Sequence, residues 1–303
     1  MSATSHRHPP RTRGGSGAPA APSPPPRGRR RSEVRTLIGE ARRGELHVMS
    51  FDIGLDTGRT DPADPAHWPT REPLVSRLLE LEQPTLLGAQ GALFHQLRSI
   101  EDGLPQRYRM IGAGSEGGSH GEHCPVFYDP LRVRLEAWEQ WWLSDCPDRV
   151  GSVGWDADRP RVALHARFVE LATERAFCLL NTRLDPAAPE ARRQATTMLV
   201  RRLRECGLPT VVTGDVAGAG DADSTWELVR TAHLTDSWSS ASQRVTPLVG
   251  TRHGYAEPQP DAPRVDWVLT SPAVRVLQAG VNTTAFLGRR PSDHAPVQAL
   301  LRL

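Results

Sequence analysis

Two periods of apolar residues alternate along the chain, and they predict strands and helices in turn. Short apolar or alternating runs predict strands, whereas apolar residues three and four positions apart predict helices. The predicted strands are 46–53, 84–90, 107–113, 125–129, 133–143, 161–171, 175–184, 208–214, 264–270, 274–281 and 296–303. The predicted helices are 71–83, 92–100 and 189–206, and a capping box at Ser224–Glu227 predicts the start of another.

The segment 189–206 has the clearest helical pattern. It ends at Gly207, a residue that favours the left-handed turn after a helix. Its apolar stripe consists of Ala191, Ala195, Met198, Leu199 and Leu203. By contrast, strands 161–171 and 175–184 flank the short segment "ATE" and predict an antiparallel hairpin.

Hairpins and strand–helix–strand crossovers occur together, which predicts an α/β architecture with mixed sheets and helices outside. The chain has no repeat, and no linker-like segment divides residues 33–303. We therefore expect one long domain over 33–303, preceded by a tail over 1–32.

The tail changes how the charge of the chain is interpreted. The whole chain has a net charge of +2, but residues 1–32 contain arginines and no acidic residue, so the body is net acidic. The tail is rich in Pro, Gly, Ser and Arg and has too little apolar surface to fold, which predicts a disordered basic tail. A solvated linker is the favoured interpretation, and a weak patch for nucleic acid or an anionic surface is the alternative.

Composition also excludes several classes of function. Every basic residue other than histidine is arginine, which excludes a lysine nucleophile. No apolar run approaches the roughly 20 residues of a membrane helix, so we expect no membrane insertion and a cytoplasmic protein. The four cysteines form no C-x-x-C pair, which argues against a zinc site or redox pair. Cys178 lies in an apolar strand pattern and Cys206 near a helix end, so we expect buried thiols there.

Carboxylates recur where predicted strands end. Asp52 lies near the end of strand 46–53, Asp215 follows strand 208–214, and Asp293 precedes the last strand. Side chains at strand ends of α/β sheets converge on one edge, where they commonly form the active site. Converging carboxylates repel one another unless a cation neutralises them, and oxygen ligands suit Mg²⁺ or Mn²⁺. We expect Asp52 and Asp293 to be the metal ligands.

Asp266 and His294 form a second candidate element. An aspartate behind a histidine fixes the tautomer of the ring and stabilises its charged form. Taken singly, Asp215 could shape a turn, Asp266 could lie at a sheet edge and His294 could sit in a capped loop. Taken together and in this order, they favour one site in which Asp215, Asp266 and His294 are catalytic.

The segments "VMSFDI", "LLGAQ", "NTRLD", "VVTGD", "RVDWVLTSP" and "PSDHAPV" carry a family resemblance. In this order they resemble the endonuclease/exonuclease/phosphatase superfamily, from about Leu46 to the C-terminus. The segment 151–163 is similar to a bacterial branch of that family. The resemblance implies a four-layer α/β sandwich, with two packed mixed β-sheets, helices outside, and a metal site at one end.

The chain departs from that family at several polar positions. The family has a metal-binding Glu where this chain has Gly91, a His that contacts or protonates the substrate at Arg183, and an Asn at Ala217. It also has Asn at the positions of Asp52 and Cys124. The apolar framework around these positions is retained, so the replaced residues are mainly those that the family uses to bind metal or substrate.

These departures favour a member of the fold whose Mg²⁺-dependent phosphoester hydrolysis is weak or lost. Arg183 could bind phosphate, or pair with Asp52 or Asp215 in place of the metal. Such a protein could retain a phosphorylated ligand or a protein partner and need no cofactor. The alternative is an active phosphoesterase that uses Mg²⁺ or Mn²⁺ and a rearranged site of Asp52, Asp215, Asp266, Asp293 and His294, with its substrate among phosphorylated small molecules or phosphodiesters.

Composition leaves nucleic acid open as a substrate, because the body is acidic but arginine is plentiful. A cluster of tryptophans, Trp138, Trp141 and Trp142, offers an interaction surface only if it is exposed. We expect these rings to pack in the core and the sheets instead.

Overall fold

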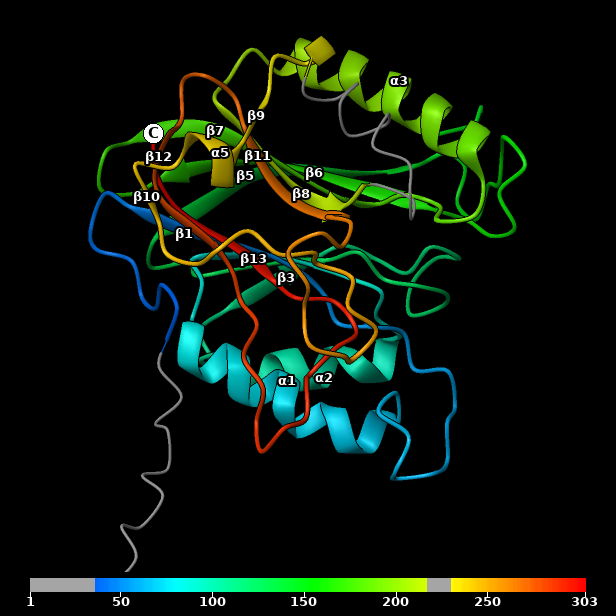
Figure 1. The fold of residues 1–303 in the computed structure, drawn as a ribbon. Helices are drawn as coiled ribbons and strands as arrows, with labels where there is room; N and C mark the ends of the chain where they lie inside the picture. The colour runs from blue at the N-terminus through cyan, green and yellow to red at the C-terminus, as the bar shows by residue number, and fades with distance from the viewer. Residues whose placement is uncertain (1–35, 217–229) are drawn as a thin grey trace, which may run out of the picture. The chain divides into compact units, whose positions relative to one another are not determined.

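The computed structural model describes residues 36–216 and 230–303, which form two mixed β-sheets (Figure 1). The seven-stranded sheet contains β1 (Leu46–Asp52), β2 (Leu86–Gln90), β3 (Arg109–Ile111), β4 (Val126–Tyr128), β10 (Gln243–Arg244), β12 (Arg275–Val281) and β13 (Val297–Arg302). The six-stranded sheet contains β5 (Val133–Trp142), β6 (Val162–Glu170), β7 (Arg175–Arg183), β8 (Thr210–Asp215), β9 (Thr235–Asp236) and β11 (Asp266–Thr270). The helices are α1 (Trp68–Glu82), α2 (Phe94–Gly103), α3 (Pro189–Cys206) and α5 (Ser237–Ser240).

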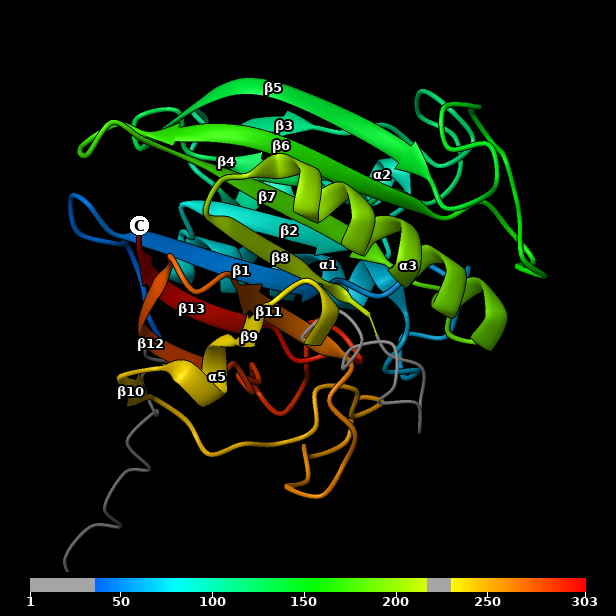
Figure 2. The same ribbon diagram turned by 90° about the horizontal axis from the view of Figure 1, so that it is seen from above.

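Apolar side chains form one layer between the sheets and one on each outer face. Val48, Leu164 and Phe168 belong to the buried cluster between the two sheets. On one outer face, α1 and α2 pack against β1 and β2, and on the other α3 packs against β7 and β8. Figure 2 shows α3 lying across the six-stranded sheet. The predicted four-layer α/β sandwich is confirmed.

The strand order is β10-β12-β13-β1-β2-β4-β3 in the seven-stranded sheet and β5-β6-β7-β8-β11-β9 in the six-stranded sheet. The crossover through α1 makes β1 and β2 parallel, and the crossover through α3 makes β7 and β8 parallel. The hairpin predicted from the "ATE" segment is confirmed as the antiparallel pair β6 and β7. The two-residue strands β9 and β10 and the four-residue helix α5 were not predicted, because elements so short show no period.

The prediction that Cys178 and Cys206 are buried thiols is wrong. Cys178 in β7 and Cys206 at the end of α3 form a disulfide across a sequence separation of 28 residues. The spacing gave no sign of the pair, because only the packing of α3 on the sheet brings them together. Cys124 is a buried free thiol, and Cys146 is an exposed one.

The tryptophans divide between packing and exposure. Trp141 and Trp142 are buried, in agreement with the packing prediction, whereas Trp138 is 43% exposed. No helix among residues 36–216 and 230–303 is long and apolar enough to span a membrane. The basic tail, the domain boundary at residue 33, Ala217 and the helix start at Ser224 all lie outside the described residues.

Candidate active site

Strand register brings four charged residues to one edge of the sandwich. Asp52 is the last residue of β1, and Arg183 at the end of β7 is paired with Asp215 at the end of β8. Asp266 begins β11, which runs antiparallel to β8, so its register partner is also Asp215. Sequence-distant charges therefore meet because their strands end or begin at the same level.

A buried polar layer ties the two sheets together directly behind these charges. The Gln90 amide donates to Asn181 Oδ1 at 2.6 Å, and Thr213 donates to the same oxygen at 2.9 Å. The backbone N–H of Gly214 donates to Ser50 Oγ at 2.9 Å. Because these donors and acceptors are buried, their hydrogen bonds hold the two sheets together behind the strand ends that carry the site.

Arg183 lies among three carboxylates. Its Nε is 2.7 Å from Asp52 Oδ2 and 3.7 Å from Asp215 Oδ2, while Nη1 donates to Glu122 at 2.9 Å. The Nε–H does not point along the line to Asp52, so this contact is an ion pair without a hydrogen bond. Burial opposes the charge of Arg183, but the surrounding acids outweigh it and raise the pKa of the guanidinium well above its usual value.

Glu122 extends the ion pairs into a second layer. It accepts from Arg161 Nη1 at 3.2 Å, and Arg161 Nε donates to Asp185 at 3.4 Å. Sequence reasoning missed Glu122, Arg161 and Asp185. The available signal was their position, because each lies within four residues of the end of a buried strand at this edge.

Asp52 occupies space that a side chain at position 91 would need. Its carboxylate is fully buried, and Oδ1 accepts from the Gly54 N–H at 2.9 Å. Gly91 has a φ of 65°, and a Cβ on it would lie 2.3 Å from Asp52 Oδ1. The two departures from the family pattern are therefore sterically linked: the carboxylate at 52 stands where a side chain at 91 would begin.

Asp266 lies against the ring of His294. Nδ1 of His294 is 2.8 Å from Asp266 Oδ2, and both side chains are buried. Burial alone would lower the pKa of His294, but Asp266, Asp52 and Asp215 raise it to about 10. Nδ1 therefore carries a proton and donates a hydrogen bond to Asp266. With this raised pKa, the ring is positively charged at neutral pH.

The remaining carboxylates respond to the same field. Burial and the neighbouring Asp266 raise the pKa of Asp215 to about 8. Burial would also raise the pKa of Asp52, but Arg183 and His294 outweigh it and lower that pKa. Asp52 thus remains the ionised carboxylate at the centre of the site.

Of the two residues expected to be metal ligands, Asp52 belongs to a group of candidate ligand atoms that lie close together. Within the described ranges, Asp52, Asp215 and His294 form a group whose ligand atoms lie within 4.8 Å of one another. Asp293 lies outside that group, where its carboxylate accepts from Ser292 Oγ at 3.4 Å. Its backbone carbonyl accepts from the His253 and Gly254 N–H groups, which tie it to the preceding loop.

Comparison with other proteins identifies the fold family. No protein-family model and no curated protein matches the chain. An endonuclease/exonuclease/phosphatase from Bacteroides vulgatus has a TM-score of 0.77 and 29% identity, covering 86% of this chain and 99% of its own. A mannosyl-6-phosphatase from Bacteroides thetaiotaomicron has a TM-score of 0.77 and 28% identity, covering 85% and 100%.

The chain belongs to the endonuclease/exonuclease/phosphatase superfamily. The human Nocturnin catalytic domain, with a TM-score of 0.64 and 16% identity over 86% of this chain and 95% of its own, shares the fold alone. Superfamily enzymes generally depend on a divalent metal, so the presence of Arg183 beside Asp52 is the feature that any account of function must explain.

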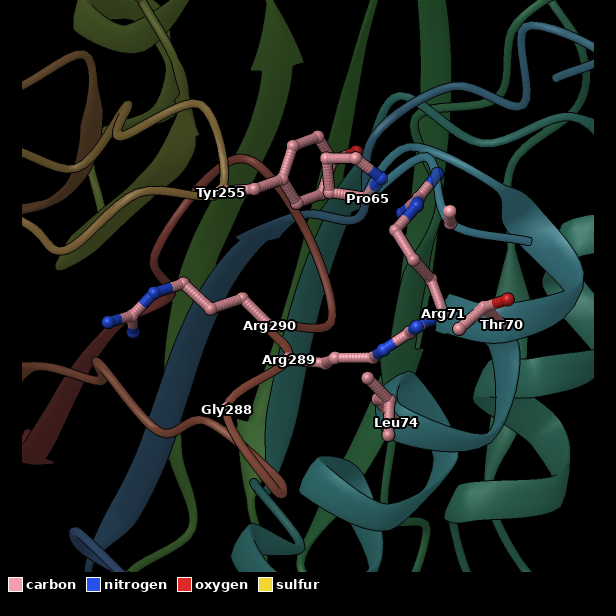
Figure 3. Close-up of a pocket in the computed structure, with 9 residues that line it drawn as sticks. Pro65, Thr70, Arg71, Leu74, Tyr255, Gly288, Arg289 and Arg290 are labelled. Atoms are coloured by element: carbon pink, nitrogen blue, oxygen red, sulfur yellow. The ribbon is translucent and has the colours of Figure 1, made fainter. Parts of the chain in front are cut away.

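A pocket of about 150 Å³ is lined by Arg71, Tyr255 and residues 288–290, and Arg71 and Tyr255 lie near each other at its wall (Figure 3). Arg71 donates to the carbonyls of Ile53, Gly54 and Pro291, so its guanidinium is held by backbone. Although arginines line this pocket, Arg71 already donates most of its N–H groups to backbone carbonyls and has few left for a ligand.

The pKa shifts predict how stability depends on pH without metal. The pKa of His294 rises from 6.5 to about 10 on folding, and that of Asp215 from 3.8 to about 8. Both groups bind their proton more tightly when folded, so their contribution is present at low pH and is lost as pH rises through the folded pKa. Chemical denaturation in EDTA should show the free energy of unfolding falling from about pH 7 to about pH 10. His294→Asn should flatten this slope, and a wild-type stability that rises over the same range would contradict the assignment.

Proposed function

We propose that in this superfamily member Arg183 takes the place of the divalent cation, so that Mg²⁺-dependent phosphoester hydrolysis is weak or lost and a phosphorylated ligand is bound instead. The observation that carries the proposal is the position of Arg183, 2.7 Å from Asp52 and hydrogen-bonded to Glu122. A fixed positive charge already neutralises the carboxylates that a metal would otherwise neutralise.

The donors around Arg183 do not fit Mg²⁺. This ion requires near-octahedral oxygen ligands at about 2.0–2.1 Å. Asp52 Oδ2 faces the guanidinium, and Oδ1 already accepts from Gly54. A divalent ion at Asp52 would also lie next to a buried guanidinium, and two cations at that separation repel strongly in a low-dielectric site.

Proton transfer is weakened as well. The superfamily resemblance puts a histidine at the position of Arg183, and a guanidinium with a pKa above about 12 cannot donate a proton at neutral pH. Loss of one general acid typically costs about 10²–10⁴-fold in rate. The Glu expected at position 91 is also absent, and the buried carboxylate of Asp52 fills the space beside Gly91.

Arg183 and His294 give the site its capacity for an anion. Arg183 retains 17% of its side-chain exposure, and the charged His294 faces the same Asp52. A guanidinium binds phosphate oxygens through a planar set of donors. The mannosyl-6-phosphatase among the similar structures makes a hexose 6-phosphate the first ligand to test.

The clustering of Asp52, Asp215 and His294 supports a second candidate function. If Arg183 moved aside, these residues, with Asp266 behind His294 and with Asp293, could hold Mg²⁺ or Mn²⁺. The ion would then stabilise charge on a phosphoryl oxygen and lower the pKa of a bound water, as in a working phosphoesterase.

A panel of phosphomonoesters and phosphodiesters, assayed with Mg²⁺ and Mn²⁺, separates the two functions. We expect wild-type turnover to match the background of Asp293→Ala and His294→Ala, and calorimetry to detect no divalent-ion binding at millimolar concentration. Turnover that both substitutions abolish would overturn the proposal in favour of the active phosphoesterase. Titration with hexose 6-phosphate should show binding that Arg183→Ala removes and that Arg167→Ala, at an exposed ion pair, leaves unchanged.

A further inference from the structure

A second group of ligand-type side chains lies under α3, away from the carboxylates. His165 in β6, Cys178 in β7 and Cys206 at the end of α3 each offer an atom within 4.8 Å of the other two. Cys178 and His165 face the α3 side of the sheet, because Cys178 shares the parity of Leu180, the register partner of His165. We call these three residues the His165 group.

The ring of His165 is held in place by stacking, but one of its nitrogens lacks a hydrogen bond among the described residues. Trp141 stacks on it at 5.4 Å between ring centroids, with an interplanar angle of 15°. The guanidinium of Arg202 lies over the ring of Trp141, 4.9 Å from its centroid. His165 Nε2 is nevertheless buried with no hydrogen-bond partner among the described residues. A buried nitrogen without a partner costs free energy, so its retention calls for a reason.

We propose that reduction of the Cys178–Cys206 disulfide converts the His165 group into a Cys₂His zinc site. Zinc–sulfur and zinc–nitrogen distances of about 2.3 and 2.0–2.1 Å place tetrahedral ligand atoms roughly 3.3–3.8 Å apart. The ligand atoms of the group already lie within 4.8 Å, so binding needs only small shifts. His165 and Cys206 are half-buried, which leaves a fourth position for water.

Charge also favours a cation at this place. Two thiolates neutralise Zn²⁺, and soft sulfur ligands select zinc over the Mg²⁺ suited to carboxylates. Cys206 is the last residue of α3, whose C-terminal carbonyls carry a partial negative charge. The site could not be predicted from the sequence, because its ligands come from three elements and form no C-x-x-C motif.

The conversion is a two-electron reduction by a dithiol. One thiolate of the dithiol attacks the half-buried Cys206 sulfur, and Cys178 leaves as a thiolate. The second thiol of the dithiol then displaces Cys206, so the dithiol becomes the disulfide and the protein gains two thiols. Zn²⁺ binding to these thiols with His165 releases two protons.

Cobalt(II) provides a probe that distinguishes this site from any oxygen-ligated site. Thiolate-bound Co²⁺ gives a sulfur-to-metal charge-transfer band in the near ultraviolet, whereas carboxylate and imidazole ligands do not. We expect the full chain to show this band after treatment with a dithiol and not before, and Zn²⁺ to displace Co²⁺ and abolish it. Thiol alkylation and mass spectrometry would confirm reduction.

Substitutions assign the ligands. Cys206→Ser should abolish the band, and Cys178→Ser should do the same if that more deeply buried variant folds. His165→Gln should weaken Co²⁺ affinity by about tenfold or more, at least the loss seen for residues that only support a ligand. Cys146→Ser, at the exposed free thiol, should leave the band intact. Absence of the band in the fully reduced wild type, or its persistence in Cys206→Ser, would overturn the proposal.

Discussion

Replacing Arg183 with alanine should lower the free energy of unfolding by about 3–5 kcal/mol in EDTA, because it leaves buried charges without a partner. Asp52 is fully buried 2.7 Å from Arg183, and Glu122 loses its hydrogen bond to Nη1. Added Mn²⁺ should restore part of this stability to the variant, since a ligand that binds only the folded state stabilises it. Denaturant unfolding with and without metal measures both effects.

Arg167 provides a matched control. Its Nε is also 2.7 Å from a carboxylate, that of Glu136, but its side chain is 52% exposed. Water screens such a pair, so Arg167→Ala should cost less than about 1 kcal/mol and should create no response to Mn²⁺. A wild-type protein that Mn²⁺ stabilises as strongly as the Arg183→Ala variant would show that Arg183 does not take the place of the cation.

Gly91→Ala should lower the free energy of unfolding by about 3 kcal/mol, the combined cost of a left-handed backbone and of overpacking. Gly91 has a φ of 65°, and the new Cβ would lie 2.3 Å from Asp52 Oδ1. The same clash predicts that Gly91→Glu will not recreate a metal ligand while Asp52 is present. Equilibrium unfolding of the purified variants checks the first effect, and calorimetry with Mg²⁺ checks the second.

Gly207 separates the two costs. It has the same φ of 65°, but a Cβ there would meet nothing within 4 Å. Gly207→Ala should therefore cost only the backbone part, about 1 kcal/mol. In an Asp52→Ala background, Gly91→Ala should fall towards that value, since the clashing oxygen is gone. Equal effects of Gly91→Ala and Gly207→Ala in the wild-type background would argue against the steric link.

Apolar periodicity predicted the long elements, because each long strand and helix must bury one face. Strand 46–53 and helix 189–206 were placed within about a residue, and Asp52 and Asp215, expected at one edge, lie together there. Glu122 was missed because it lies in a loop, and loops show no period. The pairing of Cys178 with Cys206 was missed because it depends on how α3 packs.

The sequence by itself determined the fold class, the family and the aspartates Asp52, Asp215 and Asp266 at the strand ends. The periodicity of apolar residues is sufficient to predict the fold class, and the order of the motifs is sufficient to indicate the family. Only the tertiary structure decided what the charges do to one another. Arg183 could have faced a ligand or a carboxylate, and its contact with Asp52 depends on β1 and β7 meeting across two sheets. The interaction energy between two charges weakens with distance and strengthens with burial, and both quantities depend on the tertiary structure.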